Sequence, residues 1–467
     1  MKINFRPYQA FKNYLQLDHY DILKLLLLAG AFFCIIGSYS ILRSLKTSLF
    51  LGLVGKEYQP ISRLISLFII FPCGILYSKL VDKLKRQQIF YTVIGIYAAL
   101  SFVFAVLFAH PEFGVKNTIT SPDRVLGWAF EIFMDLYSAL VLTTFWGYAN
   151  SISTPLFANK SYGLITAISR VGGIVTPLLG LLFLHKLPIA THISIPILVF
   201  IAGIFLIFAV YCIKKIITAL PEEYLHGYDT AHHKTTTIEP EVGAKKSASK
   251  PGVFEGIKLM LTQPYVMGIF GLVYSMEVIA IIFDYQMQVL MSIETNNNIG
   301  SMSSFMFIYT SSFQALGLLF ALFGTSTLLK RFGTLNCLLI MPVAVLSLSV
   351  LTFMYPSLST IFFVMIVLRA LNYGFNYPVR ETLYIPTVKD IQFKAKLWID
   401  SFGKTFSKSS GSLFNQFLLY FSSNPYFILR VDSIYCVGVA CVYGVISLLI
   451  GKKYQRTILN GEVIGRK

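Results

Sequence analysis

The stretch from residue 366 to residue 416, IVLRALNYGFNYPVRETLYIPTVKDIQFKAKLWIDSFGKTFSKSSGSLFNQ, begins as an apolar helix and then places charged side chains where a membrane disfavours them. Arg369, Asn372, Asn376 and Arg380 recur at a spacing that stacks them along one face of a helix. An arginine near the centre of a membrane helix costs roughly 2.5–3.5 kcal/mol on insertion scales. The stripe therefore predicts a hydrated cavity or a counter-charge beside it, and most simply a site that binds an anion.

The next helix repeats this design. After the polar turn Pro386–Lys396, a second polar face is formed by Asp400, Lys404, Ser407, Lys408, Gly411 and Asn415. Lys404 and Lys408 are one helical turn apart, and like charges at this spacing destabilise a helix, so we expect something negative between them. A structural alternative is that Asp400 pairs with Lys404 and Glu381 pairs with Arg380. We favour a binding site because charged residues inside polytopic membrane proteins usually mark one.

The composition excludes an ordinary soluble globule. Of 467 residues, 55% are hydrophobic and 13% are charged, with a mean hydropathy of +0.67, whereas soluble domains are about 25% charged. The net charge of +17 is not gathered into a basic patch with exposed aromatic residues, so we expect no nucleic-acid partner. The six cysteines lie in or beside apolar segments and have no metal-ligand spacing, so we expect no disulfide, metal or cofactor.

Apolar windows of about 20 residues predict twelve membrane helices. The predicted spans are 22–46, 60–80, 89–109, 125–152, 161–184, 193–213, 264–290, 302–326, 335–354, 358–385, 397–421 and 431–451. The polar segment Lys214–Gln263 divides them into two sets of six and has the composition of a flexible cytoplasmic linker. The sequence thus predicts an all-α polytopic membrane protein resembling the major facilitator type, with an N-terminal six-helix bundle (1–213), a linker (214–263), and a C-terminal six-helix bundle and tail (264–467).

The distribution of lysine and arginine predicts the orientation of the chain. Basic residues gather at the N-terminus, after helices 2, 8 and 10, and in the C-terminal tail, whereas the turns between helices 7 and 8 and between helices 9 and 10 contain none. Both ends of the chain should therefore be cytoplasmic. The segment from Gly74 to Arg86 is a degenerate form of the helix 2–3 loop motif of the major facilitator superfamily, and Gly324 to Gly333 is a weaker counterpart in the second half. Both predict a charged latch between helix ends, and the alternative for each is a solvated basic turn.

The same deciding stretch carries a family resemblance. Arg380-Glu381-x-x-Tyr384-Ile385-Pro386 and the residues up to Gly411 resemble the C-terminal signature of the ATP/ADP translocases, the nucleotide transporters of obligate intracellular bacteria and plastids. The resemblance spans nearly the whole chain and is strongest at 36–50, 143–150 and 378–411. It implies exchange of ATP for ADP, without hydrolysis, by a multi-pass protein of the bacterial inner membrane. We therefore expect a transporter and not an enzyme. We also expect the transporter to act as a monomer.

The resemblance extends to the end of helix 1. Arg43 and Lys46 share a helical face, and the translocases have a lysine at the Lys46 position that belongs to the nucleotide site. The family also has acidic residues beside that lysine, where this chain has Ser44 and Thr47. A structural alternative is that both cations extend toward the membrane surface.

Helix 4 contains the run Phe-Trp-Gly-Tyr-Ala-Asn, which closely resembles the translocases and includes Trp146. The functional glutamate of the family aligns with Met134, so Asp135 matches it only with a shift of one residue. Trp146, together with Tyr39 and Tyr373, is a candidate for stacking on the nucleotide base.

Helices 5 and 7 supply the remaining candidates. Arg170 stands where the translocases usually have a polar amide, so the site of this chain is expected to be more cationic. Glu277, Asp284 and Gln288 share a face of helix 7, a region where the family has an essential glutamate. These acids could form a gating pair with the cations, or a proton site.

The combined hypothesis is an antiporter working by alternating access. Its expected substrate-binding residues are Lys46, Arg43, Asp135, Trp146, Arg170, Glu277, Asp284, Arg369, Asn376, Arg380, Glu381, Lys404 and Lys408. The main alternative is a transporter of the same fold for another nucleotide, a dinucleotide cofactor or a phosphorylated metabolite, with or without coupling to protons. A membrane transferase is disfavoured because the loop Phe113–Arg124 offers only Asp123 as a candidate acid, and two sets of six helices disfavour an anion channel.

Overall fold

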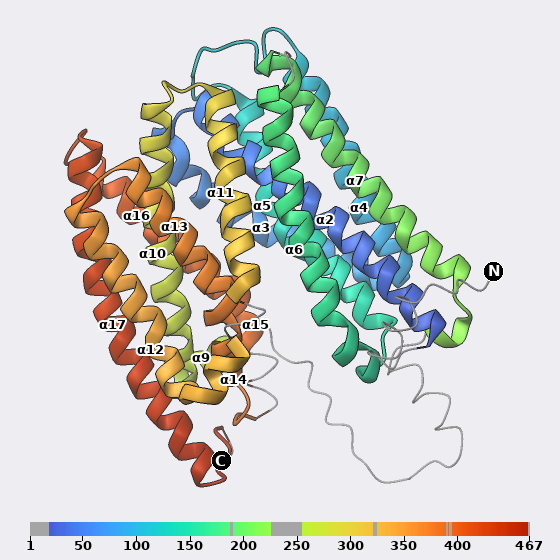
Figure 1. The fold of residues 1–467 in the computed structure, drawn as a ribbon, viewed down its shortest axis with the longest axis vertical. Coiled ribbons are helices and arrows are strands. Elements are labelled where there is room, and N and C mark those ends of the chain that lie inside the picture. Colours follow the sequence, from blue (N-terminus) through green and yellow to red (C-terminus); the bar gives the residue numbers. More distant parts are fainter. Residues whose placement is uncertain are drawn as a thin grey trace. The chain divides into compact units, whose positions relative to one another are not determined.

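The computed structural model describes residues 18–186, 190–225, 255–320, 325–388, 391 and 395–465. These residues are almost entirely helical, and the strand-like pairing recorded among them is a single bridge between Thr387 and Ile464 (Figure 1). Most of the predicted linker (226–254) and the first 17 residues lie outside the described residues. The all-α prediction is confirmed.

The first set of helices follows the predicted spans. It consists of α2 (His19–Leu53), α3 (Gln59–Lys83), α4 (Arg86–Ala109), α5 (Val125–Ser151), α6 (Pro155–Lys186) and α7 (Thr191–Ala219), with the short turns η1 (Lys56–Tyr58) and η2 (Glu222–Leu225) at two ends.

The second set begins after a short helix, α9 (Glu255–Thr262). It consists of α10 (Pro264–Glu294), α11 (Ile299–Leu319), α12 (Thr325–Met354), the segment α13 (Leu358–Leu371), η4 (Asn372–Asn376) and α14 (Tyr377–Thr382), the segment α15 (Lys396–Trp398), η6 (Ile399–Gly403) and α16 (Lys404–Leu418), and α17 (Pro425–Leu459). With each three-part segment counted once, the described residues contain the twelve predicted membrane segments. Ten of these are long and apolar enough to span a membrane by composition alone.

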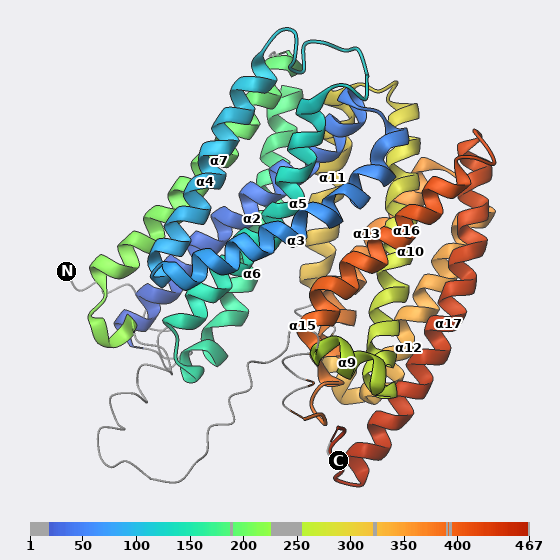
Figure 2. The ribbon, with the colours of Figure 1, turned by 180° about the vertical axis from the view of Figure 1, so that it is seen from behind.

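The two sets pack by the same scheme. In the first set α2 contacts α5, α6 and α7, and in the second set α10, its counterpart, contacts α13, α16 and α17. Likewise α4 lies along α7, and α12 lies along α17, as Figures 1 and 2 both show. This repetition indicates two copies of one six-helix design, which is the internal symmetry common in secondary transporters.

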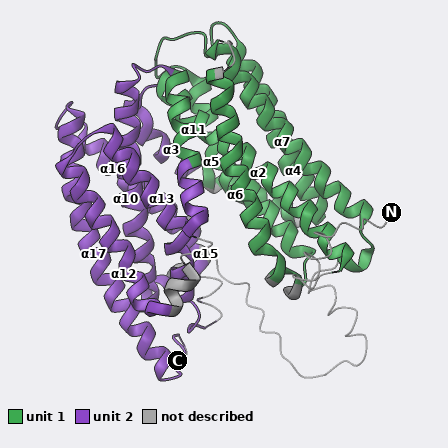
Figure 3. Ribbon diagram, viewed as in Figure 1, with its two compact units in different colours: residues 1–53, 69–245, 299–311 green, residues 54–68, 246–298, 312–467 purple. Residues whose placement is uncertain are grey.

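Contacts divide the chain into two compact units that exchange one segment each (Figure 3). Unit 1 holds residues 1–53 and 69–245 together with 299–311, and unit 2 holds 246–298 and 312–467 together with 54–68. The first part of α3 therefore packs with the second set of helices, and the first part of α11 packs with the first set. The bundle boundaries expected from the sequence, residues 213 and 264, stay a prediction. Those boundaries did not predict that the two halves exchange the segments 54–68 and 299–311.

A wide π-helical turn, η4, interrupts the segment that contains Arg369 and Arg380. Pro378 has no N–H to bond the carbonyl of Gly374, so the regular α-helical ladder cannot continue there. A Cβ atom on Gly374 would lie 2.7 Å from the carbonyl oxygen of Gly317, so glycine allows α11 to approach. π-helical turns occur often at functional sites.

Candidate functional site

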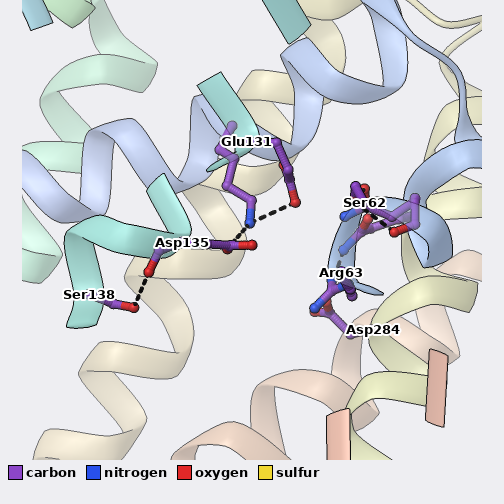
Figure 4. A network of polar contacts seen from close by, with 9 residues as sticks. Ser62, Arg63, Glu131, Asp135, Ser138 and Asp284 are labelled. Atoms are coloured by element: carbon purple, nitrogen blue, oxygen red, sulfur yellow. Dashed lines mark hydrogen bonds and ion pairs between the residues drawn. The ribbon is translucent and has the colours of Figure 1, made fainter. Parts of the chain in front are cut away.

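In unit 2, one carboxylate is shared by two arginines. Asp284 of α10 is 7% exposed, and its Oδ2 accepts hydrogen bonds from Nη2 of Arg63 at 2.8 Å and from Nε2 of Gln288 at 2.9 Å (Figure 4). Its Oδ1 lies 3.7 Å from Nη2 of Arg369, which is 6% exposed. One buried carboxylate thus faces two arginines, of which Arg369 is buried and Arg63 is half-buried.

A second cationic group surrounds the ring of Tyr377. The guanidinium carbon of Arg380, on α14, and Nζ of Lys404, on α16, each lie 5.4 Å from the centre of this ring. Arg380 is 5% exposed, yet among the described residues its guanidinium makes no hydrogen bond and no ion pair. A cation–π contact compensates only part of the cost of burying a charge. The structure thus places Arg380 and Lys404, one from each predicted polar stripe, at the same ring.

The structural alternative for these residues is half correct. Lys404 does pair with Asp400, with Nζ and Oδ1 2.9 Å apart. Glu381, however, forms its ion pair with Lys396, so it does not neutralise Arg380. Lys408 is exposed and makes no contact with Lys404 or with another charged group among the described residues.

The π-helical turn separates the two arginines of the first stripe. Asn372 and Asn376 still share a face, because Nδ2 of Asn376 donates to Oδ1 of Asn372 at 3.0 Å, and the hydroxyl of Tyr443 donates to Oδ1 of Asn376. The wide turn contains an extra residue, which rotates the helix beyond the turn by about 100°. As a result Arg369 faces Asp284 of α10, whereas Arg380 faces Tyr377 and lies near Tyr443.

In unit 1, the predicted lysine lies between two acids of α5. Nζ of Lys46 is 2.8 Å from Oε1 of Glu131 and 2.7 Å from Oδ1 of Asp135 (Figure 4). The side chain of Glu131 is fully buried, and those of Lys46 and Asp135 are 12% and 24% exposed. Two carboxylates of α5 thus share one lysine of α2.

The absence of an acid at Ser44, close to Lys46, has a structural explanation. Ser44 is fully buried, and its hydroxyl lies 2.9 Å from that of Thr310 and contacts the carbonyl oxygen of Met306, both on α11. An acidic side chain at this position would place a charge inside a tight helix contact. The acids of this lysine come from α5 instead of from its neighbours on α2.

The other predicted residues lie apart from these ion pairs. Arg43 is half-buried, 5.9 Å from the ring centre of Tyr39, and Arg170 is half-buried on α6. Trp146 packs against Phe32 and Tyr162, with ring centres 5.2 Å and 5.1 Å away, so it belongs to an aromatic cluster of unit 1. Glu277 is half-buried and makes no polar contact among the described residues.

Sequence reasoning missed three residues of these clusters, namely Arg63, Glu131 and Tyr377. Signals for two of them exist in the sequence. Arg63 is the only charge in the first half of an apolar span, and Glu131 precedes Asp135 by four residues, which puts two acids on one face of a membrane helix. Tyr377 has no such signal, because its role follows from the helix that packs beside it.

The motif after helix 2 contributes one contact of the kind expected for a latch. Nη1 of Arg86, at the start of α4, donates a hydrogen bond of 3.1 Å to the carbonyl oxygen of Ser151, at the end of α5. A cation at the carboxyl end of a helix is favourable because the helix dipole is negative there. Gly324, in the second motif, lies outside the described residues.

Solved structures with this fold are membrane transporters. A peptide transporter POT in complex with sulfate matches 92% of this chain and 95% of its own, with a TM-score of 0.58 and 14% identity. The nucleoside transporter NupG matches 92% of this chain and 99% of its own, with a TM-score of 0.53 and 14% identity. The fold is therefore that of the major-facilitator-like membrane transporters.

Within this class the sequence identifies the family. The model of the TLC ATP/ADP transporter family matches residues 4–372, and the chain belongs to this family. It is 24% identical to ADP,ATP carrier protein 1 of Rickettsia bellii (strain RML369-C), with 96% of each chain covered. It is 23% identical to ADP,ATP carrier protein 1 of Chlamydia muridarum (strain MoPn / Nigg), covering 89% of this chain and 85% of the relative.

Proposed function

We propose that this protein exchanges ATP for ADP across a membrane by alternating access. Membership of the ATP/ADP transporter family and the relatives named ADP,ATP carrier protein support this substrate pair. The site residues are assigned from the charges and contacts of the chain itself.

The observation that carries the proposal is the environment of Arg380. Arg380 is 5% exposed, and its guanidinium has no carboxylate or hydrogen-bond acceptor among the described residues, so its charge is compensated only in part, by the ring of Tyr377. A phosphate group supplies the missing compensation, because arginine binds phosphate oxygens with two parallel charge-assisted hydrogen bonds. Lys404 lies on the same ring and adds a second positive charge.

The charge balance of unit 2 supports an anionic substrate. Arg63, Arg369, Arg380, Lys396 and Lys404 are accompanied by the carboxylates of Asp284, Glu381 and Asp400. The interactions of these charges strengthen in a low-dielectric surrounding, where an unbalanced cluster attracts a polyphosphate strongly. An empty cationic site also repels itself, which disfavours crossing of the occluded state without substrate and so favours exchange over uniport.

We assign Lys46 a role in which its ammonium group exchanges a carboxylate partner for a phosphate of the substrate. In the structure Glu131 and Asp135 hold its ammonium group. A phosphate that displaces one of these acids would form an ion pair with the lysine. The released acid would then distinguish the substrate-bound state from the empty state. Both ends of the chain are proposed to face the cytoplasm, from the positions of the basic loops.

The proposal is tested by counter-exchange in proteoliposomes that contain purified protein. Arg380→Gln should lose most uptake of labelled ATP against internal ADP, while Arg430→Gln, which changes an exposed arginine of α17, should retain it. Thermal unfolding of each variant, with and without ATP, separates loss of binding from loss of folding. Full exchange by a folded Arg380→Gln protein would overturn the assignment of Arg380.

A second candidate is a carrier of the same fold for another polyphosphate or phosphorylated metabolite. The half-buried Arg170 of α6, where the translocases usually have an amide, favours it. Loading the same proteoliposomes with a panel of nucleotides, dinucleotides and sugar phosphates distinguishes the two.

A further inference from the structure

A buried acid lies outside the ion-pair clusters, in the interface between α10 and α17. Asp432 of α17 is fully buried, and among the described residues neither of its carboxyl oxygens has a hydrogen-bond partner and no lysine or arginine pairs with it. Its polar neighbour is the side chain of Gln286, which is 1% exposed. Among the described residues, an ionised carboxylate in this place would have the side-chain amide of Gln286 as its only compensation.

The unsatisfied atoms around Asp432 form a set. Oε1 of Gln286 and the hydroxyl of Tyr285, both on α10, are also buried without a hydrogen-bond partner among the described residues. Buried polar groups are nearly always paired, so three such residues at one interface need a specific explanation.

We propose that Asp432 is a proton-binding site, occupied in this state of the carrier. One added proton turns the carboxylate into a carboxylic acid, which donates its O–H to a carbonyl oxygen and accepts from an N–H. A side-chain amide offers both groups, so a protonated Asp432 and Gln286 can pair through two hydrogen bonds. The proton therefore satisfies oxygens of both residues at once, whereas an ionised Asp432 leaves Oε1 of Gln286 unpaired.

The surroundings of this site hold few other titratable groups. Tyr285 of α10 interacts electrostatically with Asp432, and Cys436 lies one turn further along α17. Tyr285 also interacts electrostatically with Glu57 of η1, which is exposed. Among the described residues, α12 and α16 add no charge to the environment of Asp432.

Glu57 connects the proton site to the transport cycle. It belongs to the segment 54–68, which comes from the first half of the sequence but packs in unit 2. Because this segment is continuous with the first half of the sequence, alternating access moves it relative to α10, and the segment then leaves Tyr285. Water that replaces it can reach Asp432 and accept its proton. The carrier therefore binds a proton when this segment is packed and releases it when the segment withdraws.

Infrared spectroscopy of the purified protein tests the protonation without reference to transport. The wild type should show the carbonyl band of a buried carboxylic acid, which Asp432→Asn removes and which Asp123→Asn, a change at an exposed loop acid, leaves in place. The absence of any band that depends on Asp432 would overturn the proposal. If Asp432→Asn does not fold, Tyr285→Phe should shift the band, since it removes the hydroxyl beside the acid, and an unshifted band would count against the site.

The pH profile of exchange tests the release step, which rests on the proposed function. Asp432→Asn mimics the protonated form permanently. The variant should therefore bind ATP but exchange it several-fold more slowly than the wild type. Its exchange rate should also lose the pH dependence that the wild type shows. Exchange by this variant that equals the wild type at every pH would reduce Asp432 to a static buried acid and overturn the release step.

A requirement for sodium in place of the pH effect would replace the proton by a metal cation. If the wild type and every variant fail to exchange nucleotides although the infrared band of Asp432 is present, the proposed function fails and the proton site stands.

Discussion

Nη2 of Arg63 lies 2.8 Å from Oδ2 of Asp284, and this ion pair joins a residue of the second helix to a residue of the seventh. The other oxygen of Asp284 faces Arg369 at 3.7 Å. One acid thus contacts two arginines, the half-buried Arg63 from the first half of the sequence and the buried Arg369 from the second. If the segment that contains Arg63 withdraws during transport, Asp284 loses one of its two arginine partners, so this movement changes how far Asp284 compensates the charge of Arg369.

This arrangement predicts an asymmetry between two neutral substitutions. Asp284→Asn leaves both arginines without their acid, whereas Arg63→Gln leaves Asp284 paired with Arg369. Breaking a buried ion pair costs about 3–5 kcal/mol, so Asp284→Asn should lower the melting temperature clearly more than Arg63→Gln. Thermal unfolding of the purified proteins in detergent measures this difference. Equal destabilisation by the two substitutions would show that Arg369 does not share the acid.

The cluster around Lys46 predicts a rescue of stability without a rescue of function. Lys46→Gln places Glu131 and Asp135 together without their cation, so the variant should be destabilised and inactive in exchange. Adding Glu131→Gln removes the repulsion and should restore much of the melting temperature but no exchange. Lys116→Gln, at an exposed loop lysine, serves as the control. Recovery of exchange in the double variant would mean that Lys46 only balances charge.

The helices could be predicted from the sequence because membrane spans are set by apolar length. The predicted span 125–152 differs from α5 by one residue at its end. The predicted spans 22–46 and 431–451 were too short, since α2 extends to Leu53 and α17 runs from Pro425 to Leu459. Apolar windows stop where the bilayer stops, whereas a helix continues into water as long as its backbone is bonded.

The site was only partly predictable, for two physical reasons. Helical periodicity assumes a regular turn, and the π-helical turn Asn372–Asn376 breaks that register between Arg369 and Arg380. Sequence spacing also shows only neighbours on one helix. The pairing of Lys46 with α5 and of Asp284 with Arg63 depends on packing between helices that are distant in the chain.

The linker gives a prediction about topology. Its middle lies outside the described residues, and the basic loops predict that it is cytoplasmic. A cysteine at Ser247 should therefore resist a membrane-impermeant maleimide in intact cells and react after permeabilisation, in a background where the exposed Cys441 is replaced by serine. A cysteine at Thr118, in the exposed loop between α4 and α5, should react in intact cells. Labelling of residue 247 from outside would invert the proposed orientation.

Arg170 is the position at which this chain differs from the usual translocase pattern in a way that concerns substrate choice. In an ATP/ADP exchanger, ATP and ADP should compete at similar concentrations and AMP poorly, because the cations bind the outer phosphates. The additional cation at Arg170 should widen tolerance toward other polyphosphates. Arg170→Asn, which restores the amide usual in the translocases, should therefore narrow selectivity toward ATP and ADP, as measured by competition with labelled ATP in proteoliposomes.

Arg43→Asn is the matched control for this substitution, because Arg43 is a half-buried cation of the same unit. If narrowing of selectivity belongs to the Arg170 position, Arg43→Asn should change the rate of exchange without changing the order of preference. Loss of all transport in a folded Arg170→Asn protein, ATP included, would make Arg170 a primary ligand of a different substrate. The assignment to ATP and ADP would then fall, while a transporter for another phosphorylated anion would remain, since the proposed role of Arg380 is to bind an anion in either case.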